Sequence, residues 1–541
     1  MNKLKLLSVF VLLGLFIAAC QPASTQVAPQ TVGEYQPSRP IPTAAMEEPI
    51  EQSSPLATQP IGQFPAAQPT PLPQPTFQPP PAGFPPADNY FRDYGLNPFV
   101  DTREDHLSTF ALDVDTASYS VARRYIQDGL LPPPEAVRVE EFVNYFEQEY
   151  PSPPEVAFGI YADGARSPFH TDGTYILRFG VQGYQVPDFA RSPANLTFVI
   201  DVSGSMAGET RLGLVKRSLE LLTEQLGPQD RVAIVVYGSQ ARVVLRPTSG
   251  SDTRYILWAI NSLKTEGSTN AEAGLRAGYQ LAWEMFQPGY INRVILLSDG
   301  VANVGATGPN QILESVRGYA EQGITLTSVG FGMGNFNDVL MERLADDGDG
   351  NYAYVDTLAE ARKIFVEDLT STLQVIALDA KVQVDFNPEV VARYRLIGYE
   401  NRDVADEDFR DDTVDAGEIG AGHSVTALYA VQLWPQAEGR LATVQLRWED
   451  PNSHEIHEIN GNFNRWDLAE SFAETSPRYK LAVVVAQYAE LLRKSPWSWE
   501  THPYELQDHT NRLVQALPAD PEVREFRDLV WQANQIGALG N

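Results

Sequence analysis

The chain has 541 residues, which is too long for one hydrophobic core and indicates several domains. It carries 40 Lys and Arg residues against 70 Asp and Glu residues, a formal charge of -30 at pH 7, which argues against nucleic acid as a partner because phosphate groups would be repelled. Its one cysteine, Cys20, leaves no intramolecular disulfide, so every domain must depend on buried apolar surface.

Residues 1–20 have the features of an export signal peptide. Lys3 and Lys5 precede an apolar run at 6–17, and two small residues then lead to Cys20. The sequence Ile17-Ala18-Ala19-Cys20 resembles the lipobox of bacterial lipoproteins, in which cleavage leaves a lipidated cysteine as the new N-terminus. The resemblance implies lipidation of Cys20 and a membrane-anchored, extracytoplasmic location, at the outer membrane or the cell surface.

The next two segments differ sharply in composition. Residues 21–88 are rich in Pro, Gln, Ala, Ser and Thr, which cannot form a core and predicts a disordered tether. Residues 89–154 are interpreted as an N-terminal α+β flank with a strand at 108–112 and helices at 117–125 and 138–146. Residues 155–192 alternate apolar and polar side chains, which predicts antiparallel strands of a sandwich.

Residues 193–375 alternate short apolar runs with amphipathic segments. The runs at 196–200, 232–237, 294–297, 324–329 and 352–355 are predicted strands, and Val215, Leu219 and Leu222 recur at helical spacing. This pattern predicts an α/β fold with a doubly wound, mostly parallel sheet covered by helices on both faces. Residues 242–245 are expected to add one antiparallel edge strand, and residues 358–373 a final helix.

The last third of the chain returns to strands and then changes to helices. Residues 376–460 contain predicted strands at 380–386, 391–399, 424–432 and 442–448, with no helices between them. Because the strands of 155–192 lie just upstream, we expect both sets to share one β-sandwich into which the α/β domain is inserted. Residues 461–541 form a helical C-terminal region, where Ser476-Pro477 and Asp520-Pro521 each place a cap before a proline.

Oxygen-bearing side chains follow two central strands of the predicted parallel sheet. Asp201, Ser203 and Ser205 follow the strand at 196–200, where Gly204 is expected to let the turn bring both serines to one side. Thr269 precedes the next helix, and Asp299 follows the strand at 294–297. Ligands bind beyond the carboxyl ends of strands in such sheets. These hard oxygen ligands favour Mg²⁺, tolerate Mn²⁺ or Ca²⁺ and disfavour zinc.

This arrangement resembles the von Willebrand factor type A (VWA) domain and its metal-ion-dependent adhesion site (MIDAS). The resemblance implies that Asp201, Ser203, Ser205 and Thr269 bind the ion directly and that Asp299 acts through water. An Asp or Glu carboxylate of a partner protein can replace a water on the ion. More loosely, the whole layout is similar to bacterial VWA-domain lipoproteins. We therefore expect a non-enzymatic, metal-dependent binding protein, whose oligomeric state stays open.

Two other functions remain as alternatives. One is an envelope assembly or scaffold factor that acts through its flanking domains. The more distant one is a magnesium-dependent phosphatase, because Asp113 and Asp115 resemble the D-x-D loop of haloacid-dehalogenase-type enzymes. Ala117 departs from that pattern, and Asp115 with Ser118 fits the start of a helix better.

Two further motifs are interpreted as plain turns. Residues 347–351 resemble the opening of an EF-hand loop, but Tyr352 and Leu358 stand where glycine and glutamate are required. Residues 330–334 form a glycine-rich turn that lacks the lysine of a phosphate-binding loop.

Overall fold

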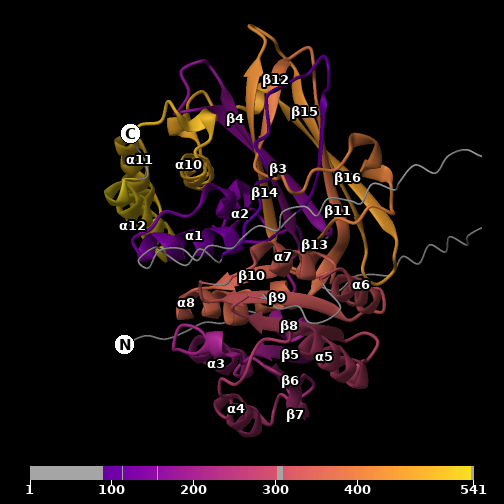
Figure 1. Cartoon of the computed structure of the whole chain (residues 1–541). Helices are drawn as coiled ribbons and strands as arrows, with labels where there is room; N and C mark the ends of the chain where they lie inside the picture. The colour runs from indigo at the N-terminus through magenta and orange to yellow at the C-terminus, as the bar shows by residue number, and fades with distance from the viewer. Residues whose placement is uncertain (1–88, 113, 155, 301–308, 335, 538–541) are drawn as a thin grey trace, which may run out of the picture. The chain divides into compact units, whose positions relative to one another are not determined.

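The computed structural model describes residues 89–112, 114–154, 156–300, 309–334 and 336–537 (Figure 1). The predicted signal peptide, the predicted lipidation site at Cys20 and the predicted tether at 21–88 lie outside these residues, and so does Asp113. All described residues fall within one structural unit of the chain. No helix in the described ranges combines the length and the apolar character needed to cross a membrane.

A six-stranded sheet forms the centre of the α/β domain. Its strands are β5 (Ala194–Asp201), β6 (Arg231–Tyr237), β7 (Ala241–Ser249), β8 (Ile291–Ser298), β9 (Thr325–Phe331) and β10 (Tyr352–Val355). Their order is β10-β9-β8-β5-β6-β7, as Figure 1 shows. All neighbours are parallel except β6 and β7, which pair antiparallel at one edge. The doubly wound, mostly parallel sheet with one antiparallel edge strand is therefore confirmed.

Helices cover both faces of this sheet. The buried side chains of α3 (Leu212–Thr223), α4 (Thr253–Asn261), α8 (Leu358–Arg362) and α9 (Leu369–Leu373) share one apolar core with the strands. Those of α5 (Ala271–Met285), α6 (Pro309–Ala320) and α7 (Asp338–Asp346) share a second core with the strands. The single helix expected at 358–373 is interrupted, because a π-helical turn at Lys363–Glu367 separates α8 from α9.

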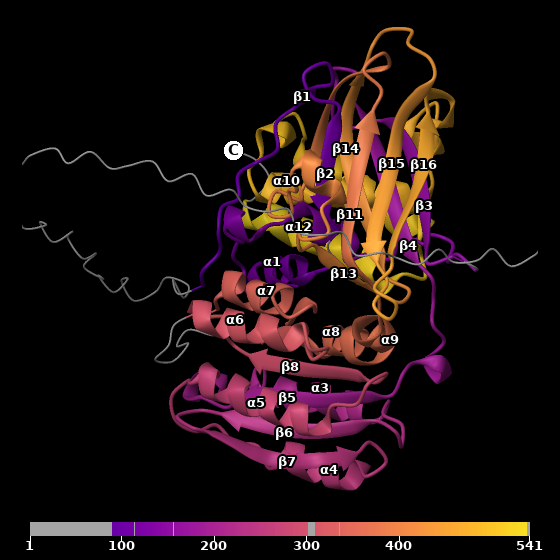
Figure 2. The same ribbon diagram turned by 90° about the vertical axis from the view of Figure 1, so that its right-hand side faces the viewer.

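Two antiparallel sheets form the sandwich. The first has the order β1-β12-β14-β4-β3 and contains β1 (Val100–Asp101), β3 (Phe158–Arg166), β4 (Tyr175–Gly183), β12 (Val391–Ile397) and β14 (Ser424–Leu433). The second has the order β13-β11-β15-β16, with β2 also paired to β11, and contains β2 (Leu107–Ala111), β11 (Val375–Phe386), β13 (Gly417–Gly420), β15 (Arg440–Glu449) and β16 (Ile456–Asn464). Both sheets can be followed in Figure 2. Buried apolar side chains from the two sheets form one shared core. Since β4 precedes the α/β domain and pairs with β14 after it, the predicted insertion is confirmed.

Residues 89–154, which the sequence sets apart as a flank, contribute to two other parts of the molecule. Strand β1 pairs with β12 in the first sandwich sheet, and strand β2 pairs with β11 in the second. Helices α1 (Ala117–Gln127) and α2 (Val139–Asn144) share an apolar core with α10 (Pro477–Leu492), α11 (Pro503–Ala516) and α12 (Pro521–Ile536). Helices α10 and α12 begin at the predicted caps, where Ser476 and Asp520 accept backbone hydrogen bonds, whereas α11 was not expected.

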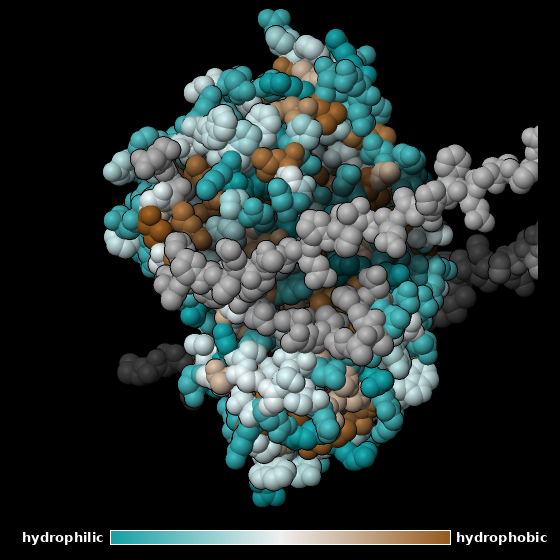
Figure 3. Space-filling view, viewed as in Figure 1, coloured by the Kyte–Doolittle hydropathy of each residue, from teal (hydrophilic) through white to brown (hydrophobic). Residues whose placement is uncertain are grey.

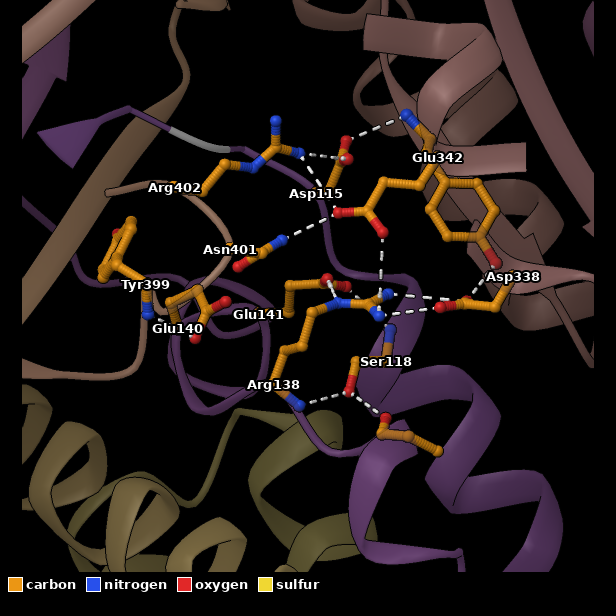
Figure 4. A network of polar contacts seen from close by, with 12 residues as sticks. Asp115, Ser118, Arg138, Glu140, Glu141, Asp338, Glu342, Tyr399, Asn401 and Arg402 are labelled. Carbon is orange, nitrogen blue, oxygen red and sulfur yellow. Dashed lines mark hydrogen bonds and ion pairs between the residues drawn. The ribbon is translucent and has the colours of Figure 1, made fainter. Parts of the chain in front are cut away.

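Ion pairs join the α/β domain to α2 and to the sandwich (Figure 4). Arg138, next to α2, lies 2.7 Å from the carboxylate of Asp338 at the start of α7. Arg402, in the segment after β12, lies 3.4 Å from Asp115 and 3.0 Å from Asp346 at the end of α7. Helix α7 is thus held at both ends by arginines from outside the α/β domain.

Candidate metal centre

Two buried carboxylates lie at the carboxyl ends of the central strands. Asp201 is the last residue of β5 and is 0% exposed, and Asp299, directly after β8, is 3% exposed. Because β5 and β8 are adjacent and parallel, their carboxyl ends meet at the same edge of the sheet. The topology therefore places two acidic groups in the position where ligands of open α/β sheets bind.

The loop after β5 turns two hydroxyl groups toward these carboxylates. The backbone N–H of Ser203 donates to Asp201 Oδ1 at 2.8 Å. The hydroxyl oxygens of Ser203 and Ser205 lie 2.9 Å apart, and the Ser205 hydroxyl donates to Asp299 Oδ1 at 3.0 Å. The structure thus brings together Asp201, Ser203, Ser205 and Asp299, four of the five side chains that the sequence singles out.

Gly204 has a smaller role than the sequence suggests. Its φ angle is not positive, and a Cβ atom there would meet its nearest neighbour, the carbonyl oxygen of Gly267, at an ordinary 3.7 Å. The turn that gathers the serines therefore does not depend on the conformational freedom of glycine. What the loop uses is the Gly204 N–H, which donates to the Gly267 carbonyl at 3.2 Å.

Thr269 lies in the neighbouring loop, which leads into α5. Two backbone hydrogen bonds join this loop to the one after β5: Glu266 N–H to the Val202 carbonyl at 2.6 Å, and Gly204 N–H to the Gly267 carbonyl. Asn270 then caps α5 by accepting from Ala273 N–H at 3.1 Å. Within the described part of the chain, the half-buried Thr269 side chain makes no hydrogen bond to the other four residues. Its role at the site remains a prediction.

Three residues that the sequence interpretation did not assign lie next to the site. The Ser298 hydroxyl donates to Asp201 Oδ2 at 3.1 Å. Tyr237, at the end of β6, is paired in register with Asp201. Arg211 Nη1 lies 3.6 Å from Asp299 Oδ2. Ser298 directly precedes Asp299 in the sequence, so the strand end itself indicated it, whereas nothing in the sequence pointed to Arg211.

The electrostatic environment of the two carboxylates favours a cation. Burial raises the pKa of Asp201, and burial followed by the charge of Asp201 raises the pKa of Asp299 to about 6. Both shifts reflect negative charge that water does not solvate fully, so a positive charge among these oxygens would be stabilised. The described residues contain no group of three or more His, Cys, Asp or Glu side chains placed to hold a metal. A metal here would therefore need the serine hydroxyls as well as the two carboxylates, and this donor set suits a hard ion.

Asp115, one of the two residues behind the phosphatase alternative, is committed to structural contacts. It is 5% exposed, it accepts a hydrogen bond from Tyr352 N–H at 2.8 Å, and it pairs with Arg402. The helix start expected at Asp115 and Ser118 is confirmed, because α1 begins at Ala117, although Thr116 occupies the N-cap position and the Ser118 hydroxyl donates to the Ala136 carbonyl. These contacts give Asp115 a structural role among the described residues.

Three family models match the chain. A model described as von Willebrand factor type A domain matches residues 195–368, and a model described as von Willebrand factor matches residues 85–177. A third, described as Uncharacterized protein YfbK, C-terminal, matches residues 371–439. The first match covers every residue of the site described above.

Proteins of similar sequence and one solved structure also match the chain. The Uncharacterized protein YfbK of Escherichia coli (strain K12) is 37% identical over 441 residues, which cover 76% of this chain and 76% of that protein. Inter-alpha-trypsin inhibitor heavy chain H4 of Homo sapiens is 30% identical over 233 residues, covering 38% of this chain and 23% of that protein. Among solved structures, a von Willebrand factor type A protein from Catenulispora acidiphila aligns with a TM-score of 0.41 and 16% identity, covering 72% of this chain and 89% of that one.

Proposed function

Because the chain belongs to the family of the bacterial protein YfbK and contains a VWA domain, we propose that it captures a partner protein through a divalent cation. A VWA domain implies protein–protein interaction or adhesion, and proteins with this domain are typically non-enzymatic. The observation that carries the finer proposal is the convergence of Asp201, Ser203, Ser205 and Asp299 at the ends of β5 and β8. We assign these four residues and Thr269 to a MIDAS, called here the proposed metal site.

The surrounding contacts hold the ligand oxygens in place. Ser203 N–H and the Ser298 hydroxyl each bind one oxygen of Asp201, which fixes the orientation of that carboxylate. The Ser205 hydroxyl donates to Asp299, so a hydrogen bond connects the loop after β5 to the end of β8. A bound ion, Mg²⁺ before Mn²⁺ or Ca²⁺, would supply an open coordination position for an Asp or Glu carboxylate of the partner.

We also propose that the binding domain is displayed outside the membrane. The support is the lipobox-like sequence ending at Cys20 and the proline-rich residues 21–88, which would act as anchor and tether. Several acyl chains on one cysteine would hold the acidic protein at a membrane, because each buried methylene contributes about 0.8 kcal/mol. Mass spectrometry of the N-terminal peptide from native membranes tests this, and an unmodified Cys20 would contradict it.

A second candidate function is an envelope scaffold that binds through the parts outside the VWA domain. Exposed aromatic side chains in the C-terminal region favour it: Trp499 and Tyr504 are each 80% exposed, and Trp531 is 55% exposed. Aromatic residues of this kind are enriched in protein interfaces. Figure 3 shows that hydrophobic areas on the visible face are small and separated by hydrophilic ones, which fits a local contact better than a broad apolar interface.

Recovery of partners from native membranes, with and without a chelator, separates the two functions. If the proposed metal site binds the partner, EDTA and Asp201→Ala each abolish recovery, and added Mg²⁺ reverses the effect of EDTA. Asp252→Ala is the matched control, because Asp252 is an exposed acid of the same domain and its side chain makes no capping hydrogen bond to α4, which it precedes. Recovery that survives both EDTA and Asp201→Ala, but is lost in Trp499→Ala, would support the scaffold instead.

A further inference from the structure

The first described residues of the chain are bound to the loop between β9 and α7. The side-chain oxygen of Asn89 accepts hydrogen bonds from Gly334 N–H at 3.0 Å and Phe336 N–H at 3.1 Å. Its side-chain nitrogen donates to the Tyr125 hydroxyl of α1 at 2.7 Å. Tyr90 adds a backbone bond to the Phe336 carbonyl at 2.8 Å. Asn89 and Tyr90, called here the leading segment, are therefore fixed to both this loop and α1, and Figure 2 shows the described part of the chain beginning beside α7.

Arg211 connects the same loop to the proposed metal site. Its guanidinium donates to the carbonyl of Met333, in the loop after β9, and to the carbonyl of Ser205, in the loop after β5. Both acceptors are neutral, and the nearest Arg211 nitrogen stays 3.6 Å from Asp299 Oδ2. Two carbonyl groups thus hold the Arg211 guanidinium near the Asp299 carboxylate, but too far away for a tight ion pair.

The glycine-rich turn after β9 makes this arrangement possible. Gly332 has a φ of +80°, and a Cβ atom there would lie 2.6 Å from Cγ and 2.7 Å from Nε of Arg211. Any other residue would therefore be strained and would also displace the arginine. Residues 330–334, interpreted above as a plain turn, have a specific use: they let the Arg211 side chain pass beneath the backbone.

Resting on the proposed metal site, we infer that Arg211 is a positioning residue of that site and that the leading segment controls it through Met333. The contacts form a continuous series from Asn89 to Gly334, from Met333 to Arg211, and from Arg211 to Ser205. The chain upstream of residue 89 joins the described structure at the first of these contacts.

The direction of the effect follows from charge. When Asn89 is released, the loop after β9 loses two of its hydrogen bonds, and the Met333 carbonyl no longer restrains Arg211. The guanidinium is then free to close the 3.6 Å gap to Asp299 and to compete with a metal ion for that carboxylate. Release of the leading segment therefore weakens metal binding, and Arg211 is required for that weakening.

Titration of the purified full-length protein with Mn²⁺, followed by electron paramagnetic resonance, tests the inference. Asn89→Ala should raise the Kd for Mn²⁺ about five-fold, at the lower limit of typical coupling between sites. Asn89→Asp should restore the affinity, because aspartate keeps the acceptor oxygen for Gly334 and Phe336 and can accept from Tyr125. In an Arg211→Met background, Asn89→Ala should leave the Kd unchanged. Arg217→Met is the control background, since Arg217 lies on α3 and pairs with the exposed Glu209.

The outcomes separate this inference from the proposed metal site. An unchanged Kd in Asn89→Ala, or the same five-fold loss with and without Arg211, would overturn the control by the leading segment while leaving the metal site intact. If the unaltered protein binds no Mn²⁺, the proposed metal site itself fails. Hydrogen exchange then still tests the series of contacts: Asn89→Ala should speed exchange in residues 203–206 when Arg211 is present and not when it is methionine.

Discussion

Arg123 and Asp356 form a bidentate ion pair in the interior of the protein, although 233 positions separate them in the sequence. Arg123 Nε donates to one carboxylate oxygen at 2.8 Å, and Nη2 donates to the other at 2.5 Å. The arginine side chain is 2% exposed and that of Asp356 is 0% exposed. Glu360 of α8 binds the same guanidinium at 2.6 Å, so Arg123 joins α1 to the last part of the VWA domain.

Arg123→Met is expected to be strongly destabilising, because it leaves Asp356 and Glu360 buried without their cation. Losing one partner of a buried pair costs about 3–5 kcal/mol. Arg124→Met is the matched control, since the neighbouring arginine forms an exposed pair with Asp128 that contributes about 1 kcal/mol or less. Denaturant unfolding measures both free energies of unfolding. Similar losses in the two variants would show that the buried pair has no special weight.

Asp349→Asn is expected to make the protein more stable at pH 8 and to have little effect at pH 4. Burial, followed by the charges of Asp415 and Asp379, raises the pKa of Asp349 to about 7. The folded state therefore prefers the protonated acid, so this stability is fully present below the unfolded pKa near 4 and is lost as the pH rises through 7. Asparagine stays neutral throughout, and it tolerates the φ of +47° at this position.

Thermal unfolding of both proteins at a series of pH values measures this effect. The difference in Tm between Asp349→Asn and the unaltered protein should grow between pH 4 and pH 8. A difference that is constant with pH would assign the gain to backbone conformation alone.

Removal of divalent metal is expected to lower the free energy of unfolding. A ligand present at about 100 times its Kd stabilises the folded state by about 2.7 kcal/mol, so saturating Mg²⁺ should raise the Tm and EDTA should reverse the rise. Asp201→Ala should unfold at the same temperature with and without Mg²⁺, whereas Asp252→Ala should respond like the unaltered protein. A Mg²⁺ response that persists in Asp201→Ala would place the ion elsewhere.

Two glycines in helices should respond in opposite ways to alanine. A Cβ atom at Gly278 of α5 would lie 2.3 Å from Val199 Cγ2 of β5, so Gly278→Ala should cost about 1–3 kcal/mol through overpacking. A Cβ atom at Gly318 of α6 would have no neighbour within 4 Å, and Gly318→Ala should stabilise the helix by about 0.5–1 kcal/mol. Thermal unfolding of each variant measures the sign, and a stabilising Gly278→Ala would contradict the close packing of α5 on β5.

The parallel strands of the VWA sheet were predictable because most of their side chains are buried on both faces. Strands such as β5 and β8 are continuous apolar runs, and their order along the chain alternates with amphipathic helices. The same logic located Asp201 and Asp299, since a polar residue directly after a buried strand must lie at the ligand-binding edge of a parallel sheet. A strand or helix could be predicted from the sequence wherever burial follows a regular pattern along that element.

Strand β16 and helix α11 were not predicted, because few of their side chains are buried, which leaves little regular apolar pattern in their sequences. Strand β16 has mostly exposed side chains and lies at an edge of its sheet, so its sequence shows little apolar alternation. Helix α11 buries only Leu506, Thr510 and Leu513. Arg211 illustrates a further limit, because the position of its side chain depends on contacts with Met333 and Gly332, which lie far away in the sequence. Contacts between distant segments have no signature in a single sequence.

The pairing of β4 with β14 affects how the protein is made. Synthesis proceeds from the N-terminus, so the ribosome releases β3 and β4 first, then the complete VWA domain, and β14 only afterwards. The hairpin of β3 and β4 must therefore wait with one edge open while a whole domain folds behind it. Until β14 is available, the edge of β4 lacks the partner that covers it in the folded protein, and an unpaired strand edge is prone to aggregation.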